Sequence, residues 1–210
     1  MVRRGLIMKE AAVFFSEFGF AASTRDLADR LGVRQALLYK YFTSKEALID
    51  EVFGEAFSEH WTRKWVHAIS DNKLPLTERL AAFYSQFMED GDRLRLRLFL
   101  RGALDGYPLP ARMAPFITDS LVKPLVAALR KVESLPDLAA KPLMIGEREL
   151  VMMLHGAMVF HQIRDEVYKA QTVKDHAAVA SLYINLFLQS ASATLRNLHS
   201  DKAPAALTQG

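Results

Sequence analysis

Apolar positions along this chain recur every three or four residues, which is the period of an amphipathic α-helix. The first such run comprises Ile7, Ala11, Phe14, Phe15 and Phe18. Gly19 follows it and predicts the end of the helix, because glycine readily adopts the left-handed conformation that terminates helices. The pattern therefore predicts a first helix that buries one aromatic face.

Serine residues predict the starts of the next helices. Ser23 and Ser44 each precede an apolar-periodic run, and a serine hydroxyl can accept hydrogen bonds from the unpaired amides of a helix N-terminus. Gly32 predicts a tight turn between a second helix and a short third helix at about 34–42. The fourth helix begins near Ser44 and is expected to reach the region of Trp61 and Trp65 as a continuous rod.

The rest of the chain shows the same period, so the predicted fold class is all-α. The predicted helices are 76–90, 93–105, 110–133, 145–171 and 175–199. The alternating run that begins at Arg93 resembles a strand, but its helical neighbours favour a helix with outward arginines. Residues 201–210 are small and polar and are expected to form a disordered tail.

Composition excludes little. The net charge is +3 and there is no cysteine among the 210 residues, so disulfides and thiolate metal sites are excluded. No apolar run reaches membrane-spanning length, and the N-terminal segment does not resemble a signal peptide, so the cytoplasm is the expected location. No phosphate loop, nucleophile elbow or paired metal motif is present in the sequence, and we expect neither catalysis, cofactor nor metal.

Residues 23–48 carry the strongest functional signal. Two short helices joined by a glycine turn have apolar residues where a helix-turn-helix packs, namely Leu27, Ala28, Leu31, Val33, Leu38 and Phe42. Gly32 supplies the positive φ of the turn. The third helix would then expose the opposite face, and a helix of this size fits the major groove of DNA.

The run STRDLADRLGVRQALLYKYFTSKEALIDEV resembles the DNA-binding region of the tetracycline-repressor (TetR) family, and the preceding IMKEAAVFFSEFGF resembles its first helix. The resemblance covers residues 5–53. It implies a homodimer of about nine helices per chain, in which the last two helices pair with those of the partner. It also implies a head at 1–48 and a ligand-binding and dimerisation domain at 49–200, with the fourth helix transmitting ligand binding to DNA release.

This resemblance assigns the DNA-contacting residues. They are Thr24, Arg25, Arg34, Gln35, Ala36, Leu37, Tyr39, Lys40, Tyr41 and Lys45. Arg34 stands where the family often has Ser or Thr and cannot cap the third helix in the same way. Lys45 lies at a helix N-terminus, where a cation is unfavourable unless an anion such as phosphate meets it. The alternative for each is a solvated or packed position without DNA contact.

A small apolar effector is expected in the second half of the chain. Candidate pocket residues are Phe99, Leu104, Tyr107, Met113, Phe116, Met152, His155 and Met158, because pockets combine apolar walls with a few polar anchors. The alternative is that these residues are ordinary core. Whether His155 or His161 touches a ligand stays open at this point.

The last helix is apolar over much of its circumference, through Leu182, Ile184, Leu186, Phe187, Ala191 and Leu195. Such a helix must be covered on two sides, so residues 145–171 and 175–199 are expected to form a dimer interface, and a charged substitution at Phe187 is expected to give monomer or insoluble protein. The predicted function is a ligand-responsive repressor on a pseudo-palindromic operator. The alternative is a DNA-binding protein that acts at many chromosomal sites through a protein partner.

Overall fold

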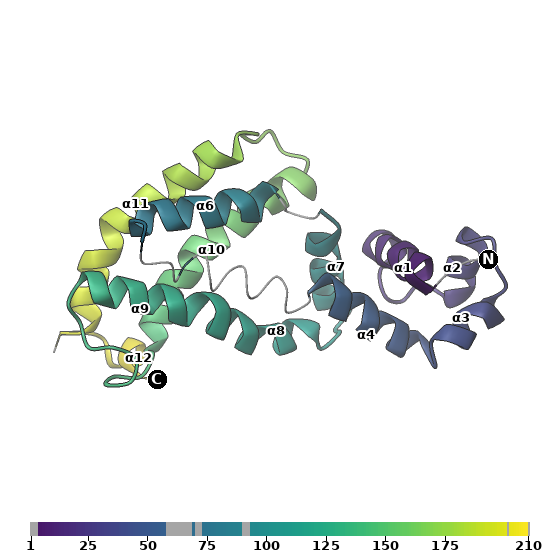
Figure 1. Ribbon diagram of the computed structural model, residues 1–210, viewed down its shortest axis with the longest axis horizontal. Coiled ribbons are helices and arrows are strands. Elements are labelled where there is room, and N and C mark those ends of the chain that lie inside the picture. The colour runs from purple at the N-terminus through teal and green to yellow at the C-terminus, as the bar shows by residue number, and fades with distance from the viewer. Residues whose placement is uncertain (1–3, 58–68, 70–72, 90–92, 201, 210) are drawn as a thin grey trace. The chain divides into compact units, whose positions relative to one another are not determined.

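The computed structural model describes residues 4–57, 69, 73–89, 93–200 and 202–209. Figure 1 shows a helical protein, and these residues contain no strand, which confirms the all-α prediction. The chain forms two compact units. The first comprises residues 1–61 and 92–113, and the second comprises residues 62–91 and 114–210.

Among the described residues, five helices lie wholly in the first unit. They are α1 (Arg4–Phe18), α2 (Thr24–Arg30), α3 (Gln35–Tyr41), α4 (Lys45–Ala56) and α7 (Arg93–Leu104). The serine caps are confirmed, because Ser23 Oγ accepts a hydrogen bond from Asp26 N at 3.1 Å and Ser44 Oγ accepts one from Ala47 N at 3.1 Å. Each cap satisfies an amide that the helix itself leaves unpaired.

The predicted helix-turn-helix packing is confirmed. Leu27, Ala28 and Leu38 are at most 1% exposed and share one core with the face of α1. Gly32 has a φ of +65° and permits the turn between α2 and α3. One expectation for α1 was wrong, because Phe18 is 59% exposed and lies outside that core.

Helix α7 extends this core beyond the expected boundary at residue 48. Asp105 Oδ2 accepts a hydrogen bond of 2.7 Å from Phe20 N, just after Gly19 at φ +79°. The ring of Tyr107 stacks on Phe20 and Phe53, with centroids 5.6 Å away in both cases. The head is therefore stabilised by a segment far from it in sequence.

The fourth helix is shorter than expected. Helix α4 ends at Ala56, and the Phe57 amide N–H donates a last hydrogen bond to Phe53 O at 2.9 Å. Phe57 leaves the helical conformation while its ring packs near Phe53 and Phe99. The expected continuous rod to Trp65 is thus wrong at residue 57, and Trp65 itself lies outside the described residues.

The second unit contains the long C-terminal helices. Its elements are α6 (Leu76–Glu89), the π-helical turn η1 (Thr118–Val122), α9 (Lys123–Val132), α10 (Ile145–Glu166), α11 (His176–Leu198) and α12 (Ala205–Thr208). Helix α8 (Leu109–Ile117) precedes η1, so the predicted helix 110–133 is interrupted by one wide turn. Helices α6 and α10 both pack on α11.

The C-terminal tail is not disordered as expected. Helix α12 packs on α10, and the Ile145 amide N–H donates a hydrogen bond of 2.8 Å to Gln209 O. Gly146 makes this approach possible, because a Cβ there would lie 2.6 Å from Leu198 Cδ2 and 3.0 Å from Leu207 O. Long-range packing, which local composition does not reveal, orders these residues.

A buried ion pair fastens α9 to α10. Arg130 and Glu147 are at most 1% exposed and form two hydrogen bonds of 2.7 and 2.6 Å. Arg130 also donates to the backbone carbonyls of the intervening loop, at Pro136, Asp137, Lys141 and Pro142. A guanidinium with so many acceptors is fully satisfied despite its burial.

Glu147 is stabilised in its ionised form. Burial alone would raise the pKa of this carboxyl group, but hydrogen bonds from Arg130, His199 and the Met144 amide outweigh burial and hold its pKa below the ordinary value. A lowered carboxyl pKa stabilises the fold above the unfolded value of 4.5 and loses that contribution as the pH falls through the lower, folded pKa.

We predict that Arg130→Met destabilises the protein by about 3–5 kcal/mol, because it leaves the Glu147 carboxylate buried without its partner. Arg196→Met is the matched control, since Arg196 is 58% exposed in its pair with Glu133 and should cost less than about 1 kcal/mol. Urea unfolding at neutral pH measures both. Equal losses in the two variants would contradict the assigned role of Arg130.

Candidate DNA-binding surface

Helix α3 presents its polar side chains outward. Arg34, Gln35, Ala36 and Lys40 are exposed, whereas Leu38 faces the core of the unit and is 1% exposed. Arg34 occupies the N-cap position without a side-chain cap, as expected. Its guanidinium is therefore not used in holding the helix start.

Thr24 does not lie on the surface as the sequence suggested. It is 5% exposed, its Oγ1 accepts a hydrogen bond of 2.7 Å from Gln35 Nε2, and it lies 3.0 Å from the Tyr39 hydroxyl. These bonds join the start of α2 to two successive turns of α3. Thr24 thus fixes the orientation of Gln35 and Tyr39 instead of being exposed itself, and nothing in the local sequence indicated this role.

The remaining predicted residues lie on α3 and on the neighbouring starts of α2 and α4. Arg25 is exposed, Tyr39 is 46% exposed, and Leu37 and Lys45 are half-buried. Tyr41 packs against the head core and is also half-buried. The structure thus brings all ten predicted residues into one unit, on α2, α3 and the start of α4, with four cationic side chains among them.

Arg4, at the start of α1, contacts residues of α4 and of the end of α3. It forms an ion pair with Glu51, and its guanidinium carbon lies 5.1 Å from the centre of the Phe42 ring. This arrangement combines charge attraction with a cation–π contact. Arg4 therefore ties the start of α1 to α4 and to the end of α3.

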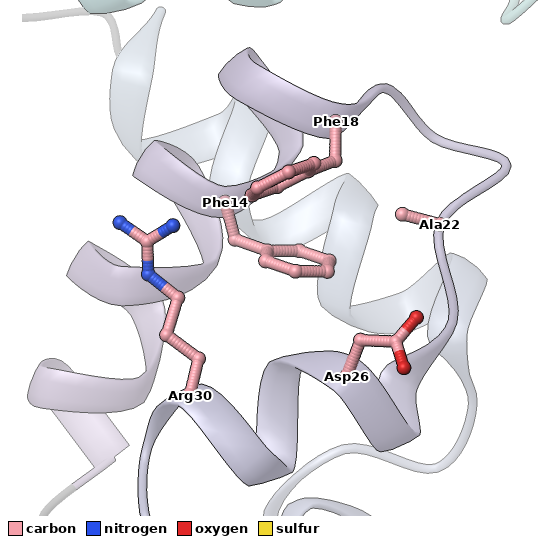
Figure 2. Close-up of a pocket in the computed structure, with 5 residues that line it drawn as sticks. All are labelled: Phe14, Phe18, Ala22, Asp26 and Arg30. Carbon is pink, nitrogen blue, oxygen red and sulfur yellow. The ribbon is translucent and has the colours of Figure 1, made fainter.

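A hollow of about 310 Å³ lies between α1 and α2. Figure 2 shows the two aromatic rings from α1 opposite the charged side chains from α2, and the lining residues are Phe14, Phe18, Ala22, Asp26 and Arg30. Arg30 is held by Glu17 at 2.6 Å. None of the predicted pocket residues lines this hollow.

The predicted pocket residues fall in two different units. Phe99, Tyr107 and Met113 pack against the core of the first unit, and Leu104 in that unit is 81% exposed. The second unit contains Phe116, Met152, His155 and Met158. The expected set is therefore not one cluster inside either unit.

His155 is surrounded by aromatic rings in the second unit. Its ring centre lies 5.2 Å from Phe87 and 6.2 Å from Tyr84, and the side chain is 7% exposed. Burial lowers the pKa of His155 to about 4, so the imidazole is neutral at physiological pH. His161 Nε2 donates a hydrogen bond of 3.2 Å to Val173 O, a contact within the unit.

Comparison with known proteins locates the similarity in the head. Residues 7–52 match the sequence model described as "Bacterial regulatory proteins, tetR family". The chain is 33% identical over 86 residues to the HTH-type transcriptional repressor KstR2 of Mycobacterium tuberculosis, which covers 40% of this chain and 42% of that protein.

Two further relatives are similar over shorter segments. KstR2 of Rhodococcus jostii is 43% identical over 51 residues, which is 24% of this chain and 25% of that protein. The uncharacterized HTH-type transcriptional regulator YhgD of Bacillus subtilis is 38% identical over 58 residues, 27% of this chain and 30% of that protein. The chain spans less than half the length of the curated relatives it matches. Residues 7–52 therefore form a helix-turn-helix domain similar to the N-terminal domain of bacterial regulatory proteins of the TetR family.

Proposed function

We propose that this protein is a dimeric, ligand-responsive transcriptional repressor that binds a pseudo-palindromic operator and is released by a small apolar effector. The observation that carries the proposal is the exposed face of α3, where Arg34, Gln35 and Lys40 project from a helix seated on a tightly packed core. Such a helix can enter the major groove with its N-terminal residues toward the base edges.

Different residues of this surface have different roles. Gln35 and Arg34 can form paired hydrogen bonds with adenine and guanine, and Ala36 and Leu37 can contact a thymine methyl group. Arg25, Tyr39, Lys40, Tyr41 and Lys45 contact phosphates, which position the head without reading sequence. Thr24 contributes indirectly, by holding Gln35 and Tyr39.

The dimer interface is proposed on α10 and α11. Met153 and Phe160 on α10 are 56% and 50% exposed, and Leu182 and Leu186 on α11 are 56% and 57% exposed. The two residues of each pair are separated by helical repeats and so share one face of their helix, and α10 packs against α11. A second copy of the same surface would cover them.

The expected place of Phe187 in the interface was wrong. Phe187 is 2% exposed and belongs to the core of its own unit, together with Ile184, Ala191 and Leu195. Helix α11 therefore has an inward apolar face and a separate outward one. By length and composition α11 could also cross a membrane, but core helices of soluble proteins pass the same test, and we assign its outward face to the dimer of a cytoplasmic protein.

Effector binding is proposed to act through the chain connections between the two units. The chain passes from one unit to the other at 61/62, 91/92 and 113/114. Helix α7 lies between two of these connections and contacts α1 directly. An effector shifts the equilibrium only by its differential affinity for the two forms, so DNA and effector must weaken each other by the same factor.

We predict that Lys45→Ala weakens binding to mixed-sequence duplex DNA and lowers the slope of log affinity against log salt by about two, one phosphate contact per subunit. Lys131→Ala is the control, since Lys131 is an exposed lysine of the second unit. Fluorescence anisotropy at several salt concentrations measures the slope. An unchanged slope for Lys45→Ala would remove this residue from the phosphate contacts.

Thr24→Val should behave differently, because it deletes both hydrogen bonds to α3 while preserving shape. We predict roughly tenfold weaker binding to the duplex best bound from a random pool, with the salt slope on mixed DNA unchanged. Gln35→Ala should relax the base preference in the same way. Thr118→Val, in the second unit, serves as control. If Thr24→Val binds the selected duplex as tightly as wild type, the positioning role is incorrect.

The dimer prediction uses two adjacent residues with opposite orientation. Leu186→Glu should yield a folded monomer, because a charge enters the intersubunit face, whereas Phe187→Glu should unfold the second unit. Gln86→Glu on α6 controls for the added charge at an exposed site of the same unit outside the two interface helices. Sedimentation velocity and circular dichroism distinguish these outcomes. Wild type that sediments as a monomer at micromolar concentration would refute the dimer.

A further inference from the structure

Tyr84 on α6 has a buried hydroxyl group to which the described residues offer no hydrogen bond. The side chain is 0% exposed, and in the part of the chain that the structure describes its Oη has no hydrogen-bond partner. The rings around it belong to Phe83, Phe87 and His155, with centroids 4.6, 6.1 and 6.2 Å away. A tyrosine here thus supplies a hydroxyl where a phenylalanine would fill nearly the same space.

An unused hydroxyl in a core is unfavourable, since it has lost its hydrogen bonds to water and gained none in exchange. Buried polar groups in native proteins are nearly always paired, and an exception calls for an explanation. Burial also raises the pKa of Tyr84 far above its usual range, so the group stays protonated and can donate a hydrogen bond throughout the pH range in which proteins are studied.

The surroundings of Tyr84 restrict what the hydroxyl can bind. The described rings packed around the Tyr84 ring are those of two phenylalanines and of His155, which is neutral near pH 7, so none of them carries a charge. Met88, Leu154 and Met158 belong to the same buried cluster. A carboxylate or an ammonium group would lose its hydration there without meeting an opposite charge among these neighbours, whereas a neutral oxygen could pair with Oη. Methionine side chains are adaptable and let such a core repack around a guest.

We propose that the Tyr84 hydroxyl is the polar anchor of the effector, and that the effector is a neutral, mainly apolar molecule whose hydroxyl or carbonyl oxygen binds this group beside His155. This inference rests on the proposed function, since it concerns the effector of that function. It replaces the expected pocket set, which is divided between the two units, by a cluster inside the second unit alone. It also names His155, and not His161, as the histidine next to the ligand.

The first test measures the free protein. Tyr84→Phe should leave the Tm unchanged or raise it by up to about 5 °C, because it deletes an unsatisfied polar group and keeps the packing. Tyr183→Phe, a partly buried tyrosine on α11 of the same unit, is the control. A clear fall in Tm for Tyr84→Phe would show that the hydroxyl already has a partner, such as a buried water, and would overturn the proposal.

The second test measures binding with probes that share one apolar body. Cyclooctanol and cyclooctanone carry a neutral oxygen, cyclooctane carries none, and cyclooctanecarboxylate carries a charge. Affinities for the full-length protein come from thermal shifts at graded probe concentrations. We expect wild type to bind the alcohol and the ketone more tightly than the hydrocarbon and the carboxylate. Tyr84→Phe should bind the alcohol and ketone roughly threefold to tenfold more weakly and the hydrocarbon equally well.

The outcomes separate this inference from the function on which it rests. If wild type and Tyr84→Phe bind the alcohol with equal affinity, the anchor is wrong while the apolar effector stands. If the carboxylate binds best, the neutral class is wrong. If none of the four probes shifts the Tm of wild type, both the anchor and the proposed apolar effector are refuted, while DNA binding by the head is unaffected.

Discussion

The DNA-binding head depends on the packing of α7 against α1 and α4. A helix-turn-helix segment of about fifty residues is near the lower size limit at which a hydrophobic core stabilises a fold. Here the core is enlarged by the stacked rings of Phe20, Phe53 and Tyr107, and Asp105 fixes the chain where α1 ends. Gly102 permits the approach, since a Cβ there would lie 3.1 Å from the Phe53 ring.

Two buried polar side chains of the second unit differ in whether their hydrogen-bonding groups are satisfied. Arg130 is surrounded by acceptors and joins α9, its following loop and α10 into one framework. Such a saturated group specifies one structure and leaves nothing for a ligand. Tyr84 is as deeply buried, yet its hydroxyl is unsatisfied within the described residues. This contrast distinguishes a structural polar group from one that is available for binding, and it motivates the assignment of the effector anchor.

Local signals in the sequence predicted most of the fold. The caps at Ser23 and Ser44 and the turn at Gly32 depend only on neighbouring residues, and they are confirmed. Features set by distant contacts were missed. The residues near Phe57 contain no sequence signal that predicts the end of α4. The burial of Thr24 results from its partners on α3. Helical periodicity identified α11 as apolar on two sides but could not say which side faces its own core, so Phe187 was placed on the wrong one.

The central claim is that two copies of this head bind one DNA duplex through α3. The most direct test is to enrich random-sequence duplexes on the full-length protein and sequence the bound pool. Two-fold symmetry predicts an inverted repeat whose half-sites are centred about one helical turn, or a multiple of one turn, apart. A pool that shows no enriched sequence, or a single half-site without its inverted partner, would contradict the account.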